Sequence, residues 1–212
     1  MPDIVYTPWL HFHQPLVWRK IGDKEQLAGN LFKMMGGEPN SEELWNSKLI
    51  SRAYKNPATY VLRLRSEGFN PKIVLDFSGT LLQSLFELSY SGAFDSVEVH
   101  GEIIGNIIEL YKKAISTCPD AIEIASTAYY HCYFPATPDR DWSAQIEAWR
   151  ELFARIFGSR ALERVKGFWL PEMGVPDEAK MAKLIRVLKK AGYSWLILPP
   201  HAVEAASKNV ES

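Results

Sequence analysis

Short apolar runs alternate with longer amphipathic stretches along this chain, and this alternation most constrains its fold. The apolar runs cover residues 4–10, 72–77, 121–126, 165–170 and 194–198. Runs of this length are typical of buried strands. Strand and helix alternating in this way predict parallel strands with right-handed crossovers. We therefore expect an α/β fold, either a (β/α) barrel of an incomplete type or an open sheet.

Apolar spacing also predicts where several helices begin and end. One apolar helical face ends at Gly158, and a second lies between Asp177 and Gly192. We expect Asn56-Pro57 to open another helix that ends at Gly68, because proline suits a first helical turn. Asn40 with Glu43 is the predicted cap of the helix before it. The long segment 20–38 is predicted to be a loop, broken at Gly36-Gly37, that folds over the strand ends as a lid.

Size and composition limit the domain organisation and the function classes. The 212 residues, 47% of them apolar, suit one large domain or most of one. About five strand–helix units do not close an eight-unit barrel, so we expect an open sheet or part of a larger domain. The formal charge of -1 argues against nucleic-acid partners and a basic membrane surface. No G-x-G-x-x-G follows the first strand, so the usual dinucleotide signature is absent.

The two cysteines and the N-terminal residues give information on the cellular compartment. Cys118 and Cys132 form no C-x-x-C pair, so neither a zinc ribbon nor a redox motif is supported. The N-terminal residues show no basic region followed by an apolar stretch, and no uncharged apolar run approaches the roughly 18 residues of a membrane span. We expect a soluble, cytoplasmic protein.

The segment 167–174, GFWLPEMG, carries the sharpest chemical signal. An apolar strand ends at Pro171, because proline has no N–H to continue the ladder. Glu172 is therefore predicted just past the carboxyl end of a strand, the edge where reactive groups collect in α/β folds. Beside Trp169, this carboxylate is a candidate nucleophile for sugar chemistry.

The segment HFHQP at 11–15 is predicted to follow the first strand. Strand alternation places His11 and His13 on the same side. Two such imidazoles could bind a metal or hydrogen-bond a polyhydroxy ligand, and an H-x-H in a polar loop can also be accidental. Only His131 among the remaining histidines lies at a predicted strand end, which is a thin ligand set for zinc.

Four residues on or just after the second and third predicted strands carry weaker signals. Glu123 lies within an apolar strand, so it should have a partner, face the interior near the site or occupy an edge position. Tyr130 and His131 follow the same strand and resemble sugar-contacting residues. Asp76 ends the second strand and could be a second carboxylate, although a helix cap or turn role is the preferred interpretation.

Together these segments resemble glycoside hydrolase family 57 along the whole chain. HFHQP, the IEI and YYH segment, and GFWLPE occur in the family's order. The resemblance implies an α-glucan-active retaining enzyme, amylase-like, with an incomplete (β/α)7 barrel and no metal or cofactor. It implies that Glu172 is the nucleophile. It also implies a donor-sugar site lined by the following residues: His11, His13, Gln14, Glu123, His131 and Trp169.

The sequence departs from the family in one respect. No segment matches the family's later one that carries the acid/base aspartate, and Asp76, Asp139, Asp141 and Asp177 are not assigned to that role. We interpret 1–212 as the N-terminal part of the catalytic barrel and expect little hydrolysis by this chain alone. A missing segment or a second chain is expected to complete it.

Two alternatives stay open from the sequence. One is a metal-dependent hydrolase that uses His11 and His13. The other is a catalytically incomplete carbohydrate-binding fragment, or one subunit of a split enzyme. Hydrolase, transferase and branching activities differ in the acceptor, and these residues do not separate them.

Overall fold

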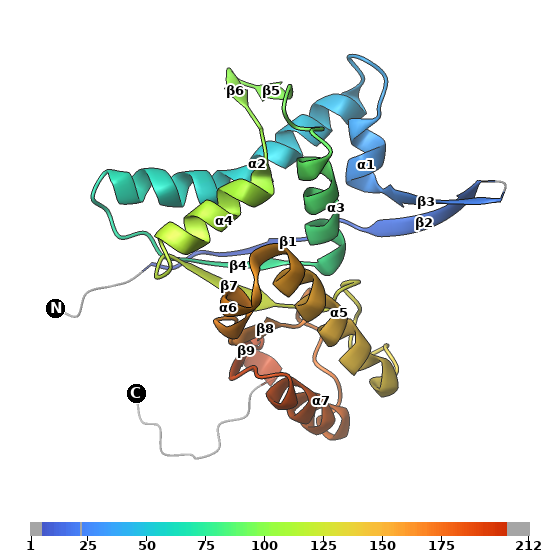
Figure 1. Cartoon of the computed structure of the whole chain (residues 1–212). Coiled ribbons are helices and arrows are strands. Elements are labelled where there is room, and N and C mark those ends of the chain that lie inside the picture. The colour runs from blue at the N-terminus through green and yellow to red at the C-terminus, as the bar shows by residue number, and fades with distance from the viewer. Residues whose placement is uncertain (1–5, 22, 203–212) are drawn as a thin grey trace.

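A computed structural model describes residues 6–21 and 23–202 of the chain. Its main feature is a five-stranded sheet in the order β1-β4-β7-β8-β9. All neighbouring strands in this sheet run parallel, which confirms the predicted α/β class (Figure 1). The strands are β1 (Trp9–Phe12), β4 (Ile73–Phe77), β7 (Ile122–Ser126), β8 (Gly167–Trp169) and β9 (Trp195–Ile197).

The first strand lies later in the sequence than predicted. Residues 6–8 are not in a strand, residues 4 and 5 lie outside the described part, and β1 covers Trp9–Phe12. His11 is therefore inside the strand, in register with Asp76 of β4, and only His13 follows it. Pairing with β4 decides where β1 begins. The apolar pattern of residues 4–10 does not reveal that pairing.

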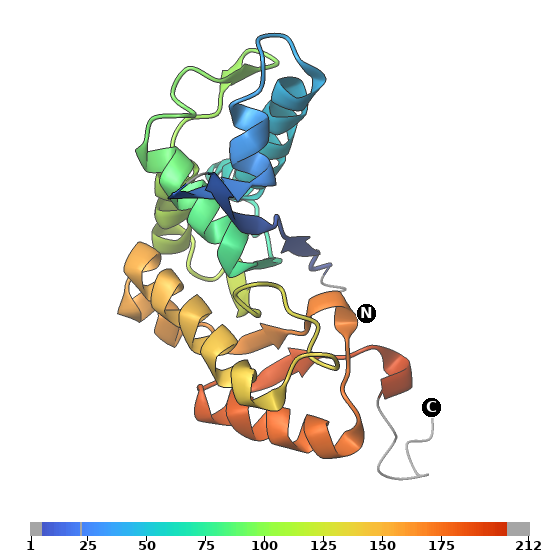
Figure 2. The ribbon, with the colours of Figure 1, turned by 90° about the vertical axis from the view of Figure 1, so that its right-hand side faces the viewer.

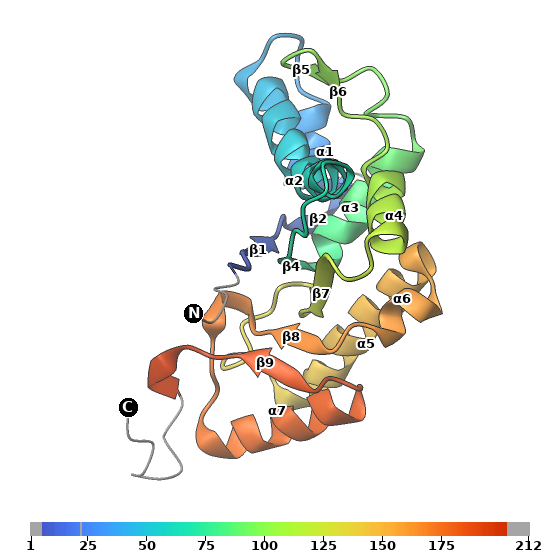
Figure 3. The same cartoon turned by 90° about the vertical axis from the view of Figure 1, so that its left-hand side faces the viewer.

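Helices cover one side of the sheet. These are α3 (Gly79–Tyr90), α4 (Ile107–Thr117), α5 (Asp139–Phe157), α6 (Ser159–Glu163) and α7 (Glu178–Lys190). Figure 3 shows the strands following one another from β1 to β9, with α4 to α7 along their outer side. The predicted ends are confirmed: α5 ends before Gly158, and Asp177 caps α7 by accepting from the Lys180 amide.

The long helix α2 (Glu42–Ser66) corrects two predictions. Pro57 lies inside this one helix instead of opening a second. Ser41, not Asn40, is the N-cap, and its hydroxyl accepts from the Leu44 amide at 3.1 Å. A proline inside a helix loses one backbone hydrogen bond, but Pro57 and Ala58 are buried against the core, and that packing offsets the loss.

The predicted lid loop is instead built from regular elements. Strands β2 (Leu16–Ile21) and β3 (Lys24–Gly29) pair antiparallel, and helix α1 (Asn30–Met35) follows. The hairpin extends away from the main sheet in Figure 1. A second short hairpin, β5 (Glu98–Val99) with β6 (Glu102–Ile103), lies between α3 and α4.

The two faces of the sheet have different surroundings. Leu75, Phe77 and Ile124 alternate with the site-facing residues and are buried under the helices. Trp149 of α5 donates its indole N–H to the Phe77 carbonyl at 2.7 Å, which ties this helix to β4. The opposite face carries His11, Asp76, Ala125, Gly167 and Trp195 in one register row. In the described ranges, no helix is long and apolar enough to cross a membrane.

Candidate active site

Residues from three strand ends meet at the carboxyl edge of the sheet. His11 lies in β1 and His13 just after it, His131 in the loop after β7, Trp169 in β8 and Glu172 in the turn after it. Figure 2 shows the orange turn after β8 on the same side as the dark blue β1. Parallel strands bring their carboxyl ends to one edge, so residues far apart in sequence become neighbours.

His11 is the centre of this cluster. Its ring stacks on Trp169 with centroids 3.9 Å apart. Its Nε2 lies 3.0 Å from Nε2 of His131, and its Nδ1 lies 2.5 Å from Oδ1 of Asp76. Both ring nitrogens therefore have partners, which fixes the orientation of the ring.

Asp76 corrects the prediction that it is a cap or turn residue. It lies within β4, is fully buried, and accepts from the Trp9 indole at 2.7 Å as well as contacting His11. Ser78 is the cap of α3 instead. The Ser78 hydroxyl lies 2.8 Å from Nδ1 of His13. Asp76 and Ser78, the D-x-S at the end of β4, therefore contact His11 and His13, the H-x-H at the end of β1, in the same order.

His13 and His131 form a partly buried stack beside His11. Burial, and then the neighbouring His131 and His11, lower the pKa of His13 from 6.5 to about 4. Burial, followed by the effect of His11, lowers the pKa of His131 as well, although Glu172 and Asp76 act in the opposite direction. Burial and like charge both disfavour the protonated ring, so these two imidazoles are neutral near pH 7.

Glu172 extends from a strained turn into solvent. It has φ 56° and ψ 21°, and Met173 also has a positive φ of 52°. Non-glycine residues rarely adopt this left-handed region. The turn η1 (Pro171–Met173) is closed by the Met173 amide, which donates to the Leu170 carbonyl at 2.9 Å. The Glu172 side chain is 72% exposed, with Oε1 3.8 Å from Nε2 of His131.

Close packing holds this turn in place. Gly174 lies against the ring of Tyr133, and a Cβ at Gly174 would overlap that ring and approach Pro135. Gly167 is covered in the same way by the indole of Trp195. The two glycines of GFWLPEMG are thus sites of close approach, which the sequence signal did not reveal.

The remaining predicted sugar contacts differ in their surroundings. Trp169 is only 8% exposed because His11 covers it. The Gln14 carbonyl accepts from the Thr80 hydroxyl at 2.8 Å, which anchors the chain after His13 to α3. Glu123 is exposed and is in register with Val74 and Trp9. It lies on the site-facing side of the sheet, two residues closer to the amino end of β7 than Ala125.

The aspartates that were not assigned to the acid/base role have other contacts. Asp139 pairs with Lys183 at 2.9 Å, and this ion pair lowers the pKa of Asp139. Asp177 caps α7, and Asp141 lies 3.7 Å from Arg140. Asp76 is held by Trp9 and His11. Each of these carboxylates thus lies beside another group of the chain.

The donor set also bears on the metal hypothesis. Nδ1 of His11 and Nδ1 of His13 are taken by Asp76 and Ser78. Among the residues that the structure describes, no group of three or more His, Cys, Asp or Glu side chains has an arrangement suited to a metal ion. The geometry therefore favours the histidines as hydrogen-bonding groups.

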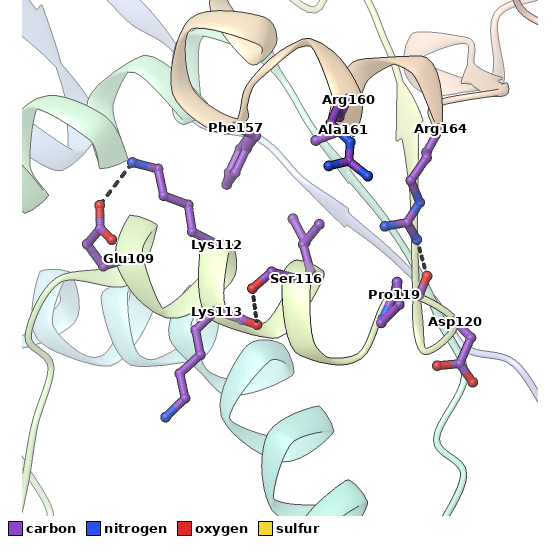
Figure 4. Close-up of a pocket in the computed structure, with 11 residues that line it drawn as sticks. Glu109, Lys112, Lys113, Ser116, Pro119, Asp120, Phe157, Arg160, Ala161 and Arg164 are labelled. Carbon is purple, nitrogen blue, oxygen red and sulfur yellow. Dashed lines mark hydrogen bonds and ion pairs between the residues drawn. The ribbon is translucent and has the colours of Figure 1, made fainter.

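A cavity of about 1090 Å³ lies elsewhere, between α4 and α6 (Figure 4). Lys112, Arg160 and Arg164 line it, together with Pro119 and Asp120 from the loop before β7. That loop enters the amino end of the strand, opposite the edge that carries Glu172. The cluster of His11, His13, His131, Trp169 and Glu172 and this cavity are separate features.

Comparison with known proteins identifies the family. The chain matches glycosyl hydrolase family 57 over residues 8–208. No significant match was found among curated proteins.

Solved structures with a similar fold cover 90% of this chain. A 4-alpha-glucanotransferase from Thermococcus litoralis is 22% identical with a TM-score of 0.51, and 22% of its length is covered. GH57 branching enzymes from Thermococcus kodakaraensis and Pyrococcus horikoshii are 19% and 18% identical, with TM-scores of 0.55 and 0.53 and 38% and 41% of their lengths covered. This chain thus spans less than half the length of each. The match over nearly all of the sequence shows that the chain belongs to glycosyl hydrolase family 57.

Proposed function

We propose that residues 1–212 form the N-terminal part of the catalytic domain of a retaining enzyme that acts on α-glucans. Glu172 is the nucleophile, and the reaction is an amylase-like hydrolysis or a transfer to another sugar. The observation that carries the proposal is the exposed Glu172 carboxylate at the carboxyl edge, beside three clustered histidines. Family membership and the glucan-active enzymes of similar fold support it.

The proposed reaction has two displacements. A Glu172 oxygen attacks the anomeric carbon, and the bond from that carbon to the leaving oxygen breaks as an acid donates a proton to it. Water or a sugar hydroxyl then attacks the anomeric carbon of the glycosyl–Glu172 ester, the former acid takes the proton of that hydroxyl as a base, and the Glu172 carboxylate is released. The acid must lie about 5 to 5.5 Å from the nucleophile, and we propose that a segment outside these 212 residues, or a second chain, supplies it.

The histidine cluster has a binding role in this scheme. His11, His13 and His131 present ring nitrogens, which can form hydrogen bonds with sugar hydroxyls. Gln14, Glu123 and Trp169 are proposed as further contacts of the donor sugar. The exposure of Glu172 and the 28% exposure of the His11 side chain leave both accessible to a ligand.

An activated donor tests the nucleophile in this chain itself. A 5-fluoro-glucosyl fluoride carries a leaving group that needs no proton, so the absent acid does not prevent the first displacement. We expect intact-mass spectrometry to show one added glycosyl group, and peptide mapping to place it on Glu172.

The matched control is Glu178→Gln, because Glu178 is also an exposed glutamate and lies in the first turn of α7. Glu178→Gln should form the adduct, and Glu172→Gln should not. An adduct on another residue, or one that persists in Glu172→Gln, would contradict the assignment.

A further inference from the structure

A buried carboxylate lies behind the histidine cluster, and the proposed reaction does not use it. Asp76 is 0% exposed and is in register with His11 on the neighbouring strand. Its Oδ2 accepts from Nε1 of Trp9 at 2.7 Å, and its Oδ1 lies 2.5 Å from Nδ1 of His11. Buried carboxylates are costly unless such donors surround them, so the arrangement calls for a specific role.

The donors and acceptors determine where the hydrogens lie. An indole N–H can only donate, and an ionised carboxylate can only accept. Nδ1 of His11 must therefore carry the hydrogen in its contact with Asp76. A neutral His11 then has a bare Nε2, and that atom lies 3.0 Å from Nε2 of His131.

We propose that Asp76 is a positioning residue that holds His11 in the tautomer protonated on Nδ1, so that the bare Nε2 of His11 accepts a hydrogen bond from His131. A carboxylate that fixes a histidine tautomer through Nδ1 is a recurring device in enzyme sites. Here two consecutive hydrogen bonds extend the effect from the sheet interior to the side chain beside Glu172.

The consequence concerns the direction of the His131 hydrogen. With His11 as acceptor, the N–H of His131 points to His11, and Oε1 of Glu172 at 3.8 Å receives no hydrogen bond from it. Burial lowers the pKa of His131, which agrees with a neutral ring. The oxygen lone pairs of Glu172 thus stay available for attack on carbon. This consequence rests on the proposed function, whereas the tautomer itself does not.

A parallel contact supports the argument. Ser78 stands to His13 as Asp76 stands to His11, since its hydroxyl lies 2.8 Å from Nδ1 of His13. The hydroxyl is neutral and can donate or accept, so it does not dictate one tautomer. Of His11 and His13, it is His11 whose Nδ1 faces a carboxylate, and this ring contacts both Trp169 and His131.

Nitrogen NMR of the 212-residue chain tests the proposal without any sugar. The protein has five histidines, so ring-labelled signals can be assigned with single substitutions. Just above neutral pH, we expect Nδ1 of His11 to show the pattern of a protonated nitrogen and Nε2 that of a bare one. A wild-type His11 protonated on Nε2 would overturn the proposal, whatever the variants do.

Two variants separate positioning from packing. In Asp76→Asn the amide can accept from Trp9 and donate to Nδ1 of His11, so we expect the His11 pattern to reverse. Trp9→Phe removes the other donor but keeps the carboxylate, so the pattern should stay as in the wild type while stability falls. Asp95→Asn, at an exposed loop position, is the matched control and should change nothing.

Each result decides the question. An unchanged His11 pattern in Asp76→Asn, or a reversal in Trp9→Phe as well, would show that general packing sets the tautomer. If Asp76→Asn does not fold, the wild-type and Trp9→Phe spectra still confirm or overturn the proposed His11 tautomer. Failure of the glycosyl-adduct experiment with a correct His11 pattern would reject the proposed function and leave the role of Asp76 intact.

Discussion

The imidazole rings of His13 and His131 stack with centroids 3.9 Å apart and an angle of 15° between their planes. His11 adjoins this pair, with its ring centroid 5.0 Å from that of His131. Three imidazoles so close together cannot all carry a charge at low cost. Burial and the neighbouring rings lower the pKa of His13 and of His131, so acidification acts against this stacked pair.

The first prediction concerns stability between about pH 6.5 and pH 4. Because the pKa of His13 falls from 6.5 to about 4 on folding, the unfolded chain binds a proton in this window that the folded chain does not. The stability that the neutral His13 ring contributes is fully present above pH 6.5 and is lost as pH falls to about 4. One pKa unit equals about 1.4 kcal/mol, and solvent screens this partly exposed ring, so we expect a loss of about 1–2 kcal/mol.

Urea unfolding at a series of pH values measures this loss. His13→Gln should flatten the dependence in that window, while His100→Gln should leave it unchanged, because His100 is an exposed residue of the β5–β6 turn. An equally steep loss in His13→Gln would show that other groups cause it.

The second prediction concerns the strain at Glu172. Its φ of 56° favours glycine, and the exposed side chain makes few stabilising contacts. Glu172→Gly relieves the left-handed backbone strain but adds the entropy cost of glycine. We expect the net effect to raise the free energy of unfolding by about 0.5–1 kcal/mol. Glu87→Gly in α3 is the control and should lower it by about 1 kcal/mol. Equal destabilisation of both variants would argue against strain at the turn.

The third prediction concerns the double role of Ser78. Ser78→Ala removes the cap of α3 and the contact to His13, so we expect a loss of about 1–2 kcal/mol and altered His13 NMR signals. Asn106→Ala removes the cap of α4 and the hydrogen bond from the Asn106 amide to the Ser89 carbonyl, and should cost about 1 kcal/mol with His13 unchanged. Unaltered His13 signals in Ser78→Ala would contradict the contact.

The fourth prediction concerns turnover. Natural α-glucans need an acid to protonate the leaving oxygen, and Asp76, Asp139, Asp141 and Asp177 already have other partners. We expect little or no release of reducing sugar from soluble starch by the 212-residue chain. Turnover that is present in this chain and abolished by Glu172→Gln would show that the acid lies within these residues.

Local patterns predicted the strands and most helices well, because burial on one face imposes a period that the sequence shows directly. The runs near 72–77, 121–126, 165–170 and 194–198 each contain a strand of the parallel sheet. Pro57 does not begin a helix as predicted, because tertiary packing tolerates a proline within α2. The hairpin β2–β3 was missed because its residues lack clear alternation.

The local sequence pattern alone predicts that a glutamate follows a strand after GFWLP, and that His11 and His13 lie on one side of the chain near the end of another strand. The contacts of Asp76 with His11 and of Ser78 with His13 depend on the tertiary structure. These partners are 65 residues apart, and strand register brings them together. Register depends on the packing of the whole sheet, so the D-x-S and H-x-H motifs reveal their relationship only when β1 and β4 are paired.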